Sequence, residues 1–229
     1  MSDSFAFLSP AAVRSTDGHR PLLRTPVERS HIAAGATIEE AGGWRIARYD
    51  AEPGDAWLAD VSHTGKLDVR GDAARVDELT GGADLGAASH HDGVWTLRIS
   101  PNHAAVICPF QRVTDLGERI GAGVTDMTCG WAAFTLGGPA MREVFMRSSS
   151  LDVRGSRFPA GRCMTGSVMR AGTIVLNEGD RFRMLVNWEV GEYFWDAILD
   201  AGETIGIART SVVAAEAPSE EAQHQEQTA

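Results

Sequence analysis

The chain has 229 residues, of which 43% are hydrophobic and 23% charged, so its composition is that of an ordinary globular protein with a sizeable core. Its formal net charge of −10 leaves no basic stripe for a phosphate backbone, and no run of about 18 apolar residues could span a membrane. We therefore expect neither nucleic-acid nor membrane partners. The N-terminus has no basic region before an apolar stretch, so no secretory signal is expected.

Three cysteines, Cys108, Cys129 and Cys163, lack a CxxC spacing. Such cysteines favour reduced thiols in a cytoplasmic protein over a disulfide frame or a zinc site. We therefore predict a cytoplasmic location.

The first segment, residues 1–24, holds scattered apolar residues between Pro10, Gly18 and Pro21. We expect an extended arm that packs either on its own domain or on a partner chain. Thr25 and Pro26 then predict a short helix, with Thr25 as N-cap and Pro26 at the first helical position, ending near residue 35. Residues 43–49 follow as a predicted strand.

Residues 60–79 and 126–146 contain the same order of features. Each segment runs from an aspartate, an apolar residue and a hydroxyl residue into a strand, a glycine and an amphipathic helix. Each is followed at a distance by another strand, at residues 94–100 and 182–186. A sequence unit that occurs twice predicts two similar α+β halves related by a pseudo-twofold axis. Ligands often bind between such halves.

The remaining elements complete the second half. Residues 109–120 are a predicted helix, and residues 166–177 and 181–187 are predicted to pair as antiparallel strands across a turn at 178–180. From Val190 apolar residues recur at i, i+3, i+4, i+7 and i+8, which predicts a helix with Gly202 as its C-cap. A final strand is expected within 205–213, and the acidic segment 214–229 is predicted to be a disordered tail.

These elements predict an α+β fold of two pseudo-repeated halves with antiparallel sheets. We expect one domain over residues 25–213, with its first half at about 25–120 and its second at about 121–213.

Two stretches of the chain resemble known families. Residues 57–66, followed by Val69-Arg70-Gly71, resemble the N-terminal signature of the glycine-cleavage T-protein, the folate-binding aminomethyltransferase. Residues 149–153, 158–163 and 193–195 are similar to the gamma subunit of heterotetrameric sarcosine oxidase. The resemblance covers most of residues 25–205 and implies a T-protein-like folate-binding fold. It also implies a complex in which larger flavoprotein chains carry the flavins and the NAD.

The two carboxylates that the T-protein uses for its chemistry have no clear counterpart here. Asp92 is the nearest carboxylate to the first position, and it looks like a turn residue before a strand. At the second position Met164-Thr165-Gly166 is followed by Ser167 in place of an acid. We therefore assign no catalytic residue to this chain.

Five residues are weak candidates for a binding site. His63 and Cys129 occupy equivalent positions in the repeat, and each is either a pocket residue or part of the core. Arg162, Cys163 and Thr165 lie in a segment that faintly resembles the cysteine motif of folate-binding iron–sulfur maintenance proteins, where Arg162 would favour a thiolate on Cys163.

A metal site is not expected. His90 and His91 have no third ligand at a supporting spacing, so a solvated loop is the favoured interpretation.

The favoured hypothesis is an accessory gamma-type subunit of a sarcosine-oxidase-like, folate-linked amine-demethylating complex. It would contribute no catalytic residues and would dock on larger flavoprotein subunits of a hetero-oligomer through the N-terminal arm, Trp57 and Trp188. This hypothesis assigns no bound cofactor to the chain itself, and tetrahydrofolate is the one ligand considered for it. The alternatives are a stand-alone tetrahydrofolate-dependent aminomethyl or methyl transferase, and an iron–sulfur maintenance factor acting through Cys163.

Overall fold

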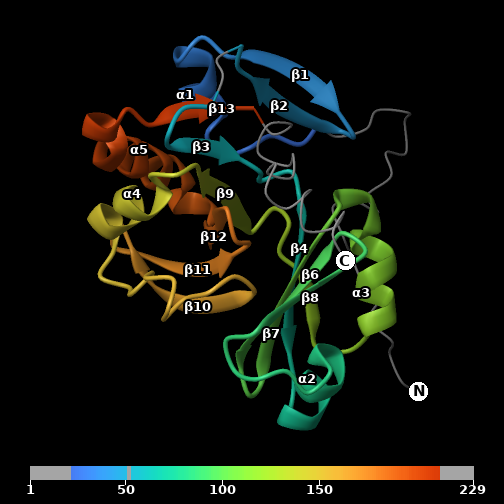
Figure 1. Ribbon diagram of the computed structural model, residues 1–229. Coiled ribbons are helices and arrows are strands. Elements are labelled where there is room, and N and C mark those ends of the chain that lie inside the picture. Colours follow the sequence, from blue (N-terminus) through green and yellow to red (C-terminus); the bar gives the residue numbers. More distant parts are fainter. Residues whose placement is uncertain (1–21, 51–52, 212–229) are drawn as a thin grey trace, which may run out of the picture.

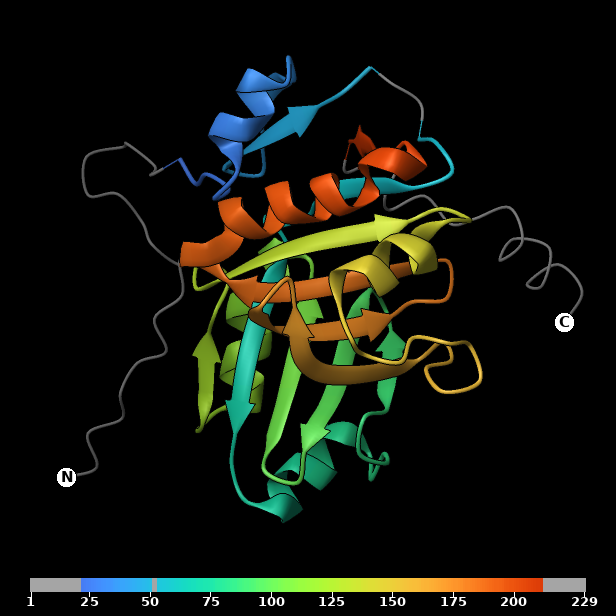
Figure 2. The same ribbon diagram turned by 90° about the vertical axis from the view of Figure 1, so that its left-hand side faces the viewer.

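The structure is a computed structural model that describes residues 22–50 and 53–211, and these form four layers (Figures 1 and 2). One central layer is a six-stranded sheet that contains, in order across the sheet, β10 (Arg162–Val168), β11 (Ala171–Asn177), β12 (Arg181–Asn187), β9 (Trp131–Gly137), β3 (Trp57–Asp60) and β13 (Ala208–Thr210). The other is a five-stranded sheet of β5 (Ala88–His91), β6 (Val94–Ser100), β7 (His103–Cys108), β4 (Gly65–Arg70) and β8 (Val124–Asp126). Neighbouring strands are antiparallel except β13 and β3, which are parallel.

Helices cover the outer face of each sheet. Helices α4 (Met141–Ser148) and α5 (Gly191–Gly202) pack on the six-stranded sheet, while α2 (Ala73–Thr80) and α3 (Val113–Ile120) pack on the five-stranded sheet. Figure 1 shows the two pairs on opposite sides of the molecule. The inner faces of the sheets meet in a separate apolar cluster, to which Leu97 and Ile107 contribute from one sheet and Leu176 and Leu185 from the other. The predicted α+β fold of two similar halves is confirmed.

An N-terminal unit packs against these layers. It consists of α1 (Glu28–Ala33) and a two-stranded hairpin of β1 (Thr37–Ala41) and β2 (Trp44–Arg48). Three short 3-10 helices, η1 (Phe110–Arg112), η2 (Trp188–Val190) and η3 (Glu203–Ile205), precede α3 and flank α5. Of the predicted arm, Leu22, Leu23 and Arg24 are described. Leu23 forms a bridge with Trp44, and residues 1–21 and the predicted tail at 214–229 lie outside the described residues.

Local sequence accounts for several element boundaries. Asp72 caps α2 by accepting a hydrogen bond from the Arg75 backbone N–H at 2.9 Å, and Gly81 ends the helix in the left-handed conformation with φ 62°. The last helix is confirmed, but its buried face is shifted from the predicted one. Phe194 and Ile198 are buried as predicted, Trp195 and Leu199 join them, and Tyr193 is 53% exposed.

Three local predictions were wrong. The first helix begins at Glu28, and Thr25 forms no side-chain cap. The continuous strand predicted over 166–177 is a hairpin of β10 and β11 that turns at Met169 and Arg170, both at positive φ (47° and 61°) without a glycine or asparagine to mark the turn. Gly202 lies inside α5, and the left-handed residue near that end of the segment is Gly206.

Within the part of the chain that the structure describes, no helix is both long and apolar enough to cross a membrane.

Candidate functional site

Each copy of the repeated segment carries the chain from one sheet to the other. The chain leaves the six-stranded sheet after Asp60 and enters the five-stranded sheet with β4, and it makes the reverse crossing after Asp126 to enter β9. The two halves therefore exchange a strand. In both crossings the aspartate accepts a hydrogen bond from the backbone N–H two residues on, from Ser62 at 3.0 Å and from Thr128 at 2.8 Å.

The two crossings are also bonded to each other. The Ser62 hydroxyl accepts from the Ala133 N–H in β9 at 3.0 Å, and the Thr128 hydroxyl accepts from the Lys66 N–H in β4 at 3.1 Å. Both hydroxyl side chains are fully buried. The hydroxyl residue of each repeat therefore holds the beginning of the strand that follows the other repeat. The bonded positions differ by one residue between the two copies. Because the bonds are mutual, both copies need a hydroxyl residue at this position.

Lys66 is the only lysine of the chain, and it lies fully buried at this crossing point. Its Nζ donates to the carbonyl oxygens of Ser62 at 2.7 Å and Thr64 at 2.9 Å. Burial lowers the pKa of Lys66 to about 7, although the Asp60 and Asp126 carboxylates oppose that shift. The sequence did not predict this burial, because Lys66 lies in a strand in which polar and apolar residues alternate.

A second buried polar group joins the crossing to the N-terminal unit. The His31 Nε2 lies 3.2 Å from the Asp60 carboxylate, and its Nδ1 lies 2.8 Å from the Tyr49 hydroxyl. Burial alone would raise the pKa of Asp60, but hydrogen bonds from His31 and Ser62 outweigh it and lower the pKa. Burial raises the pKa of Tyr49 to about 12. This group holds α1 on the body of the protein.

A cavity of about 720 Å³ opens beside the crossing, between the β1–β2 hairpin, the β5–β6–β7 part of the five-stranded sheet, and the turn that joins β11 to β12. Its size is that of pockets which hold drug-sized molecules. Part of its wall is aromatic: the His90 and Trp95 rings stack with centroids 4.6 Å apart, and Trp44 meets Phe110 edge to face at 5.6 Å. His63 and Thr64 reach the wall from the first crossing.

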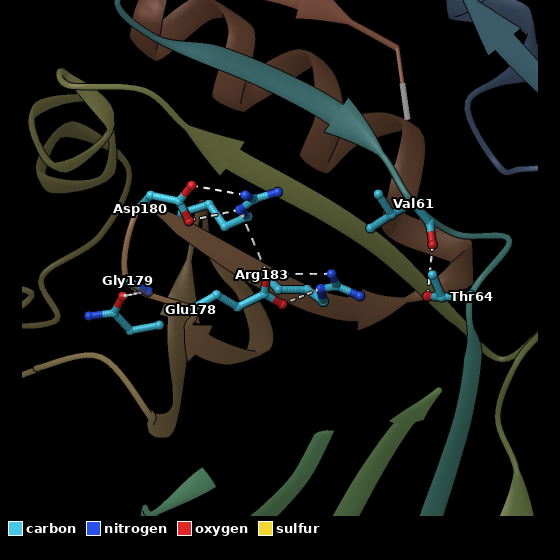
Figure 3. Close-up of polar contacts among 8 residues, drawn as sticks. Val61, Thr64, Glu178, Gly179, Asp180 and Arg183 are labelled. Atoms are coloured by element: carbon cyan, nitrogen blue, oxygen red, sulfur yellow. Dashed lines mark hydrogen bonds and ion pairs between the residues drawn. The ribbon is translucent and has the colours of Figure 1, made fainter. Parts of the chain in front are cut away.

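Another part of the wall is charged, and Figure 3 shows the ion pairs at the β11–β12 turn. Arg183 Nε lies 2.6 Å from the Glu178 carboxylate, and Arg181 lies 2.8 Å from Asp180 and 3.9 Å from Glu178. The turn itself is held by Asn177, whose side-chain oxygen accepts from the Gly179 N–H at 2.8 Å. Sequence reasoning identified this segment only as a turn, because nothing in its pattern shows that its charges face a cavity.

The five weak candidates do not come together in one site. His63 lines the large cavity, and burial lowers its pKa to about 4, so its ring is neutral at pH 7. Thr165 lines a separate pocket of about 390 Å³ between the two sheets. Arg162 donates to the Leu85 carbonyl at 2.8 Å and is bound to that loop.

The prediction that Arg162 would favour a thiolate on Cys163 is wrong. Its Sγ is buried, 3.6 Å from the Ala87 carbonyl and 3.7 Å from the Arg98 carbonyl, and burial raises its pKa to about 11 despite the nearby Arg162. Cys129 is half-buried at the second crossing, where burial also raises the pKa of its thiol and Lys66 opposes the shift.

Asp92 is a turn residue, as predicted. It precedes Gly93 in a two-residue hairpin loop between β5 and β6, both residues have positive φ (49° and 72°), and its carboxylate is paired with Arg112 at 3.0 Å. Ser167 is exposed on the edge strand β10. Among residues 22–50 and 53–211, no group of three or more His, Cys, Asp and Glu side chains could hold a metal ion.

The proposed docking role of Trp57 is contradicted by its burial. Its side chain is 8% exposed and lies beneath the Arg181 guanidinium, 6.0 Å from the ring centroid. The ring packs over Gly137 of the neighbouring strand β9, which has no side chain to displace it. Trp188 is half-buried in η2.

Comparison with known proteins confirms the predicted resemblance. Residues 92–204 match the sarcosine oxidase, gamma subunit family. The chain is 24% identical to the aminomethyltransferase of Deinococcus deserti over 80% of its own length and 23% identical to that of Streptomyces coelicolor over 81%. It spans 60% of the length of the first of these relatives and 59% of the second.

Two solved structures share the fold. A chain of heterotetrameric sarcosine oxidase from Corynebacterium sp. U-96 aligns with a TM-score of 0.63 at 21% identity, covering 80% of this chain and 96% of that one. Aminomethyltransferase T of the glycine cleavage system from Bartonella henselae aligns with a TM-score of 0.69 at 16% identity, covering 85% of this chain and 61% of that one. At these identities the likeness shows the T-protein-like fold and nothing further about activity.

Proposed function

We propose that this chain is an accessory gamma-type subunit of a sarcosine-oxidase-like, folate-linked amine-demethylating flavoenzyme complex in the cytoplasm. The observation that supports this most is the match of residues 92–204 to the gamma subunit family. The flavins and NAD would lie on the larger partner chains, as the sequence resemblance implies. The domain would extend over residues 25–213, with the two halves interlocked by their exchanged strands.

The charged groups of the large cavity support a non-catalytic role. Its three carboxylates, on Glu39, Glu178 and Asp180, are each paired with an arginine. A general base needs a lone pair within reach of the proton that it removes, and these lone pairs are engaged by guanidinium N–H groups. Asp92 and Ser167, the residues nearest the two family carboxylates in the sequence, lie on a hairpin loop and on an edge strand.

We further propose that the outer helices α4 and α5 dock on the partner. Met146 on α4 is 58% exposed and Tyr193 on α5 is 53% exposed, and the two helices pack side by side on the same face, as Figure 2 shows. Exposed methionine and tyrosine side chains are enriched at protein interfaces. Trp188, half-buried next to α5, is the remaining aromatic candidate from the sequence.

Co-expression with the large flavoprotein chain of a sarcosine-oxidase-like complex tests the subunit proposal. The chain is expected to co-elute with that partner in gel filtration, and failure to co-elute would overturn the proposal. Met146→Glu should weaken the complex by at least tenfold, because it places a charge in an apolar contact. The matched control is Ala74→Glu, which adds the same charge to an exposed position on α2 at the opposite side of the molecule and should leave co-elution unchanged.

A second candidate function is a stand-alone tetrahydrofolate-dependent aminomethyl or methyl transferase. The similarity to aminomethyltransferases and the cavity beside the crossing favour it. Assay of the isolated chain for transfer to tetrahydrofolate separates the two candidates. The subunit proposal expects no turnover without the partner, and catalytic turnover by the isolated chain would replace it with the transferase.

A further inference from the structure

We infer, on the basis of the proposed subunit function, that a patch of arginines around α4 docks on an acidic surface of the large partner chain. This arginine patch comprises Arg142 and Arg147 on α4, Arg154 and Arg157 in the loop at 149–161, and Arg170 at the β10–β11 turn. The segregation of charge, the shortage of carboxylate partners and the anchoring of the loop each support it.

The arginine patch is basic in a chain that is strongly acidic. Residues 141–170 contain six arginines and two acidic residues, a net charge of +4, whereas the whole chain carries −10. These arginines form no run in the sequence, and folding brings them together. The Met169 N–H donates to the Ser148 carbonyl at 2.8 Å, and Arg142 donates to the Val153 carbonyl. The turn and the loop therefore lie against α4, and Figure 2 shows the loop directly below that helix.

Most arginines of the patch lack a carboxylate partner. Arg147 and Arg154 are each paired with a neighbouring acid, at 2.8 Å and 2.6 Å. Within the described residues, Arg142, Arg157 and Arg170 form no salt bridge. The arginines that line the large cavity, by contrast, are all paired with carboxylates. A guanidinium without a carboxylate in its own chain can bind one on another chain, and arginine is enriched at protein interfaces.

The loop that carries Arg154 and Arg157 is anchored to the core. It runs from 149 to 161 without a helix or strand, yet Val153 is 1% exposed and Phe158 is 2% exposed. The Phe158 carbonyl also accepts from the Asn177 side chain at 2.7 Å. Long loops inside a compact domain are often binding loops. Because this backbone is already held in place, docking costs little further ordering of the loop.

An acidic protein surface fits the arginine patch better than a nucleic acid does. The residues outside 141–170 carry the remaining net charge of −14, which repels a long polyanion everywhere except at the patch. A protein partner can match the patch with a few carboxylates, and it can also cover Met146, which is 58% exposed on the same helix.

The arginine patch ends at α5. That helix exposes Glu192, Asp196 and Asp200 and contains no basic residue. A partner with acids opposite α4 and bases opposite α5 fits in one orientation, because turning it around would bring like charges together. A second copy of this chain, with α4 of one copy opposite α5 of the other, is the competing occupant. The match of residues 92–204 to a subunit family favours the flavoprotein partner.

Association kinetics of the full chain with the large flavoprotein chain of a sarcosine-oxidase-like complex test this inference. Arg157→Glu and Arg170→Glu should each slow association about fivefold at 50 mM NaCl. At 500 mM NaCl the effect should fall below about twofold, because salt screens the attraction. Arg119→Glu is the matched control. It makes the same charge change at an exposed arginine of α3, on the opposite side of the molecule, and should alter the rate less than about twofold.

Binding to the partner and its dependence on the patch are separate results. If the native chain binds but both patch variants associate as fast as the control, the inference is overturned and the subunit function stands. If the native chain does not bind the partner at either salt concentration, the subunit function fails and the inference fails with it. Dimerisation of the chain alone that Arg157→Glu abolishes, or patch-dependent binding to a DNA oligonucleotide, would identify a different occupant and would also overturn the inference.

Discussion

Replacing Lys66 with methionine should change how the stability of this protein depends on pH. Lys66 is fully buried and its pKa is lowered to about 7, whereas a lysine in the unfolded chain titrates near 10.4. Between these two values the unfolded state binds more protons than the folded state. The free energy of unfolding therefore rises with pH across this window, by up to about 1.4 kcal/mol per pH unit.

Methionine removes the titrating group and keeps most of the side-chain volume. From pH 7 to pH 8.5 the folded state of the native protein changes from half protonated to almost unprotonated, so its stability should gain about 1.5 kcal/mol that the variant does not gain. The variant should be less stable at both pH values, because the carbonyls of Ser62 and Thr64 lose the Nζ donor. Its deficit should grow by about 1.5 kcal/mol between them.

The assay is urea unfolding followed by circular dichroism at pH 7.0, 7.75 and 8.5. Titrating groups that do not interact with Lys66 contribute equally to both proteins and cancel in the difference. Leu67→Met is the matched control, because Leu67 is a fully buried neighbour in β4 that carries no proton. A deficit of Lys66→Met that stays constant with pH, like that of the control, would refute the assignment of a lowered pKa to this amine.

Three further substitutions or reactions test the fold and the site. Asp60→Asn should cost about 3 kcal/mol in urea unfolding because it removes a buried carboxylate that is hydrogen-bonded to His31 and Ser62, and the cost should shrink as pH falls through the lowered pKa of this carboxyl; a cost below about 1 kcal/mol at pH 7 would contradict this. Gly137→Ala should cost about 2 kcal/mol because its Cβ would overlap the indole ring packed against it, whereas Gly172→Ala, with open space around its Cβ, should be almost neutral in the same assay. In native protein at pH 8, iodoacetamide should leave Cys163 unlabelled while half-buried Cys129 reacts, and mass spectrometry showing the reverse would contradict the raised pKa of the Cys163 thiol.

The helices and strands that were predicted correctly are those whose sequence patterns depend only on neighbouring residues. The strands at residues 94–100 and 181–187, the helix that follows Asp72 and the last helix depend on periodicity, capping and flanking turns, which neighbouring residues decide. The turn at Met169 and Arg170 was missed for the same reason, because it has none of the usual turn residues. The two strands around it form a hairpin because they pair with each other and with the sheet.

The large cavity could not be derived from the sequence. Trp44, Trp95 and Arg183 come from three separate segments, and only the packing of the N-terminal hairpin beside the two sheets brings them around one cavity. Of the five residues singled out beforehand, His63 alone lines this cavity. Burial cannot be read from residue type either: Trp57 is interior because its ring packs over Gly137 of the neighbouring strand and beneath the Arg181 guanidinium.

The repeated segment separates what the sequence determines from what only the tertiary structure determines. By itself the sequence determined that the chain contains two similar α+β units, because each copy encodes its own turn, strand and helix. Only the tertiary structure decided that each copy crosses between the sheets, so that the halves exchange strands and Ser62 and Thr128 each hold the opposite strand. The same arrangement buries the only lysine of the chain, since the hydrogen bonds that keep Lys66 in the interior come from carbonyls that the crossing itself turns inward.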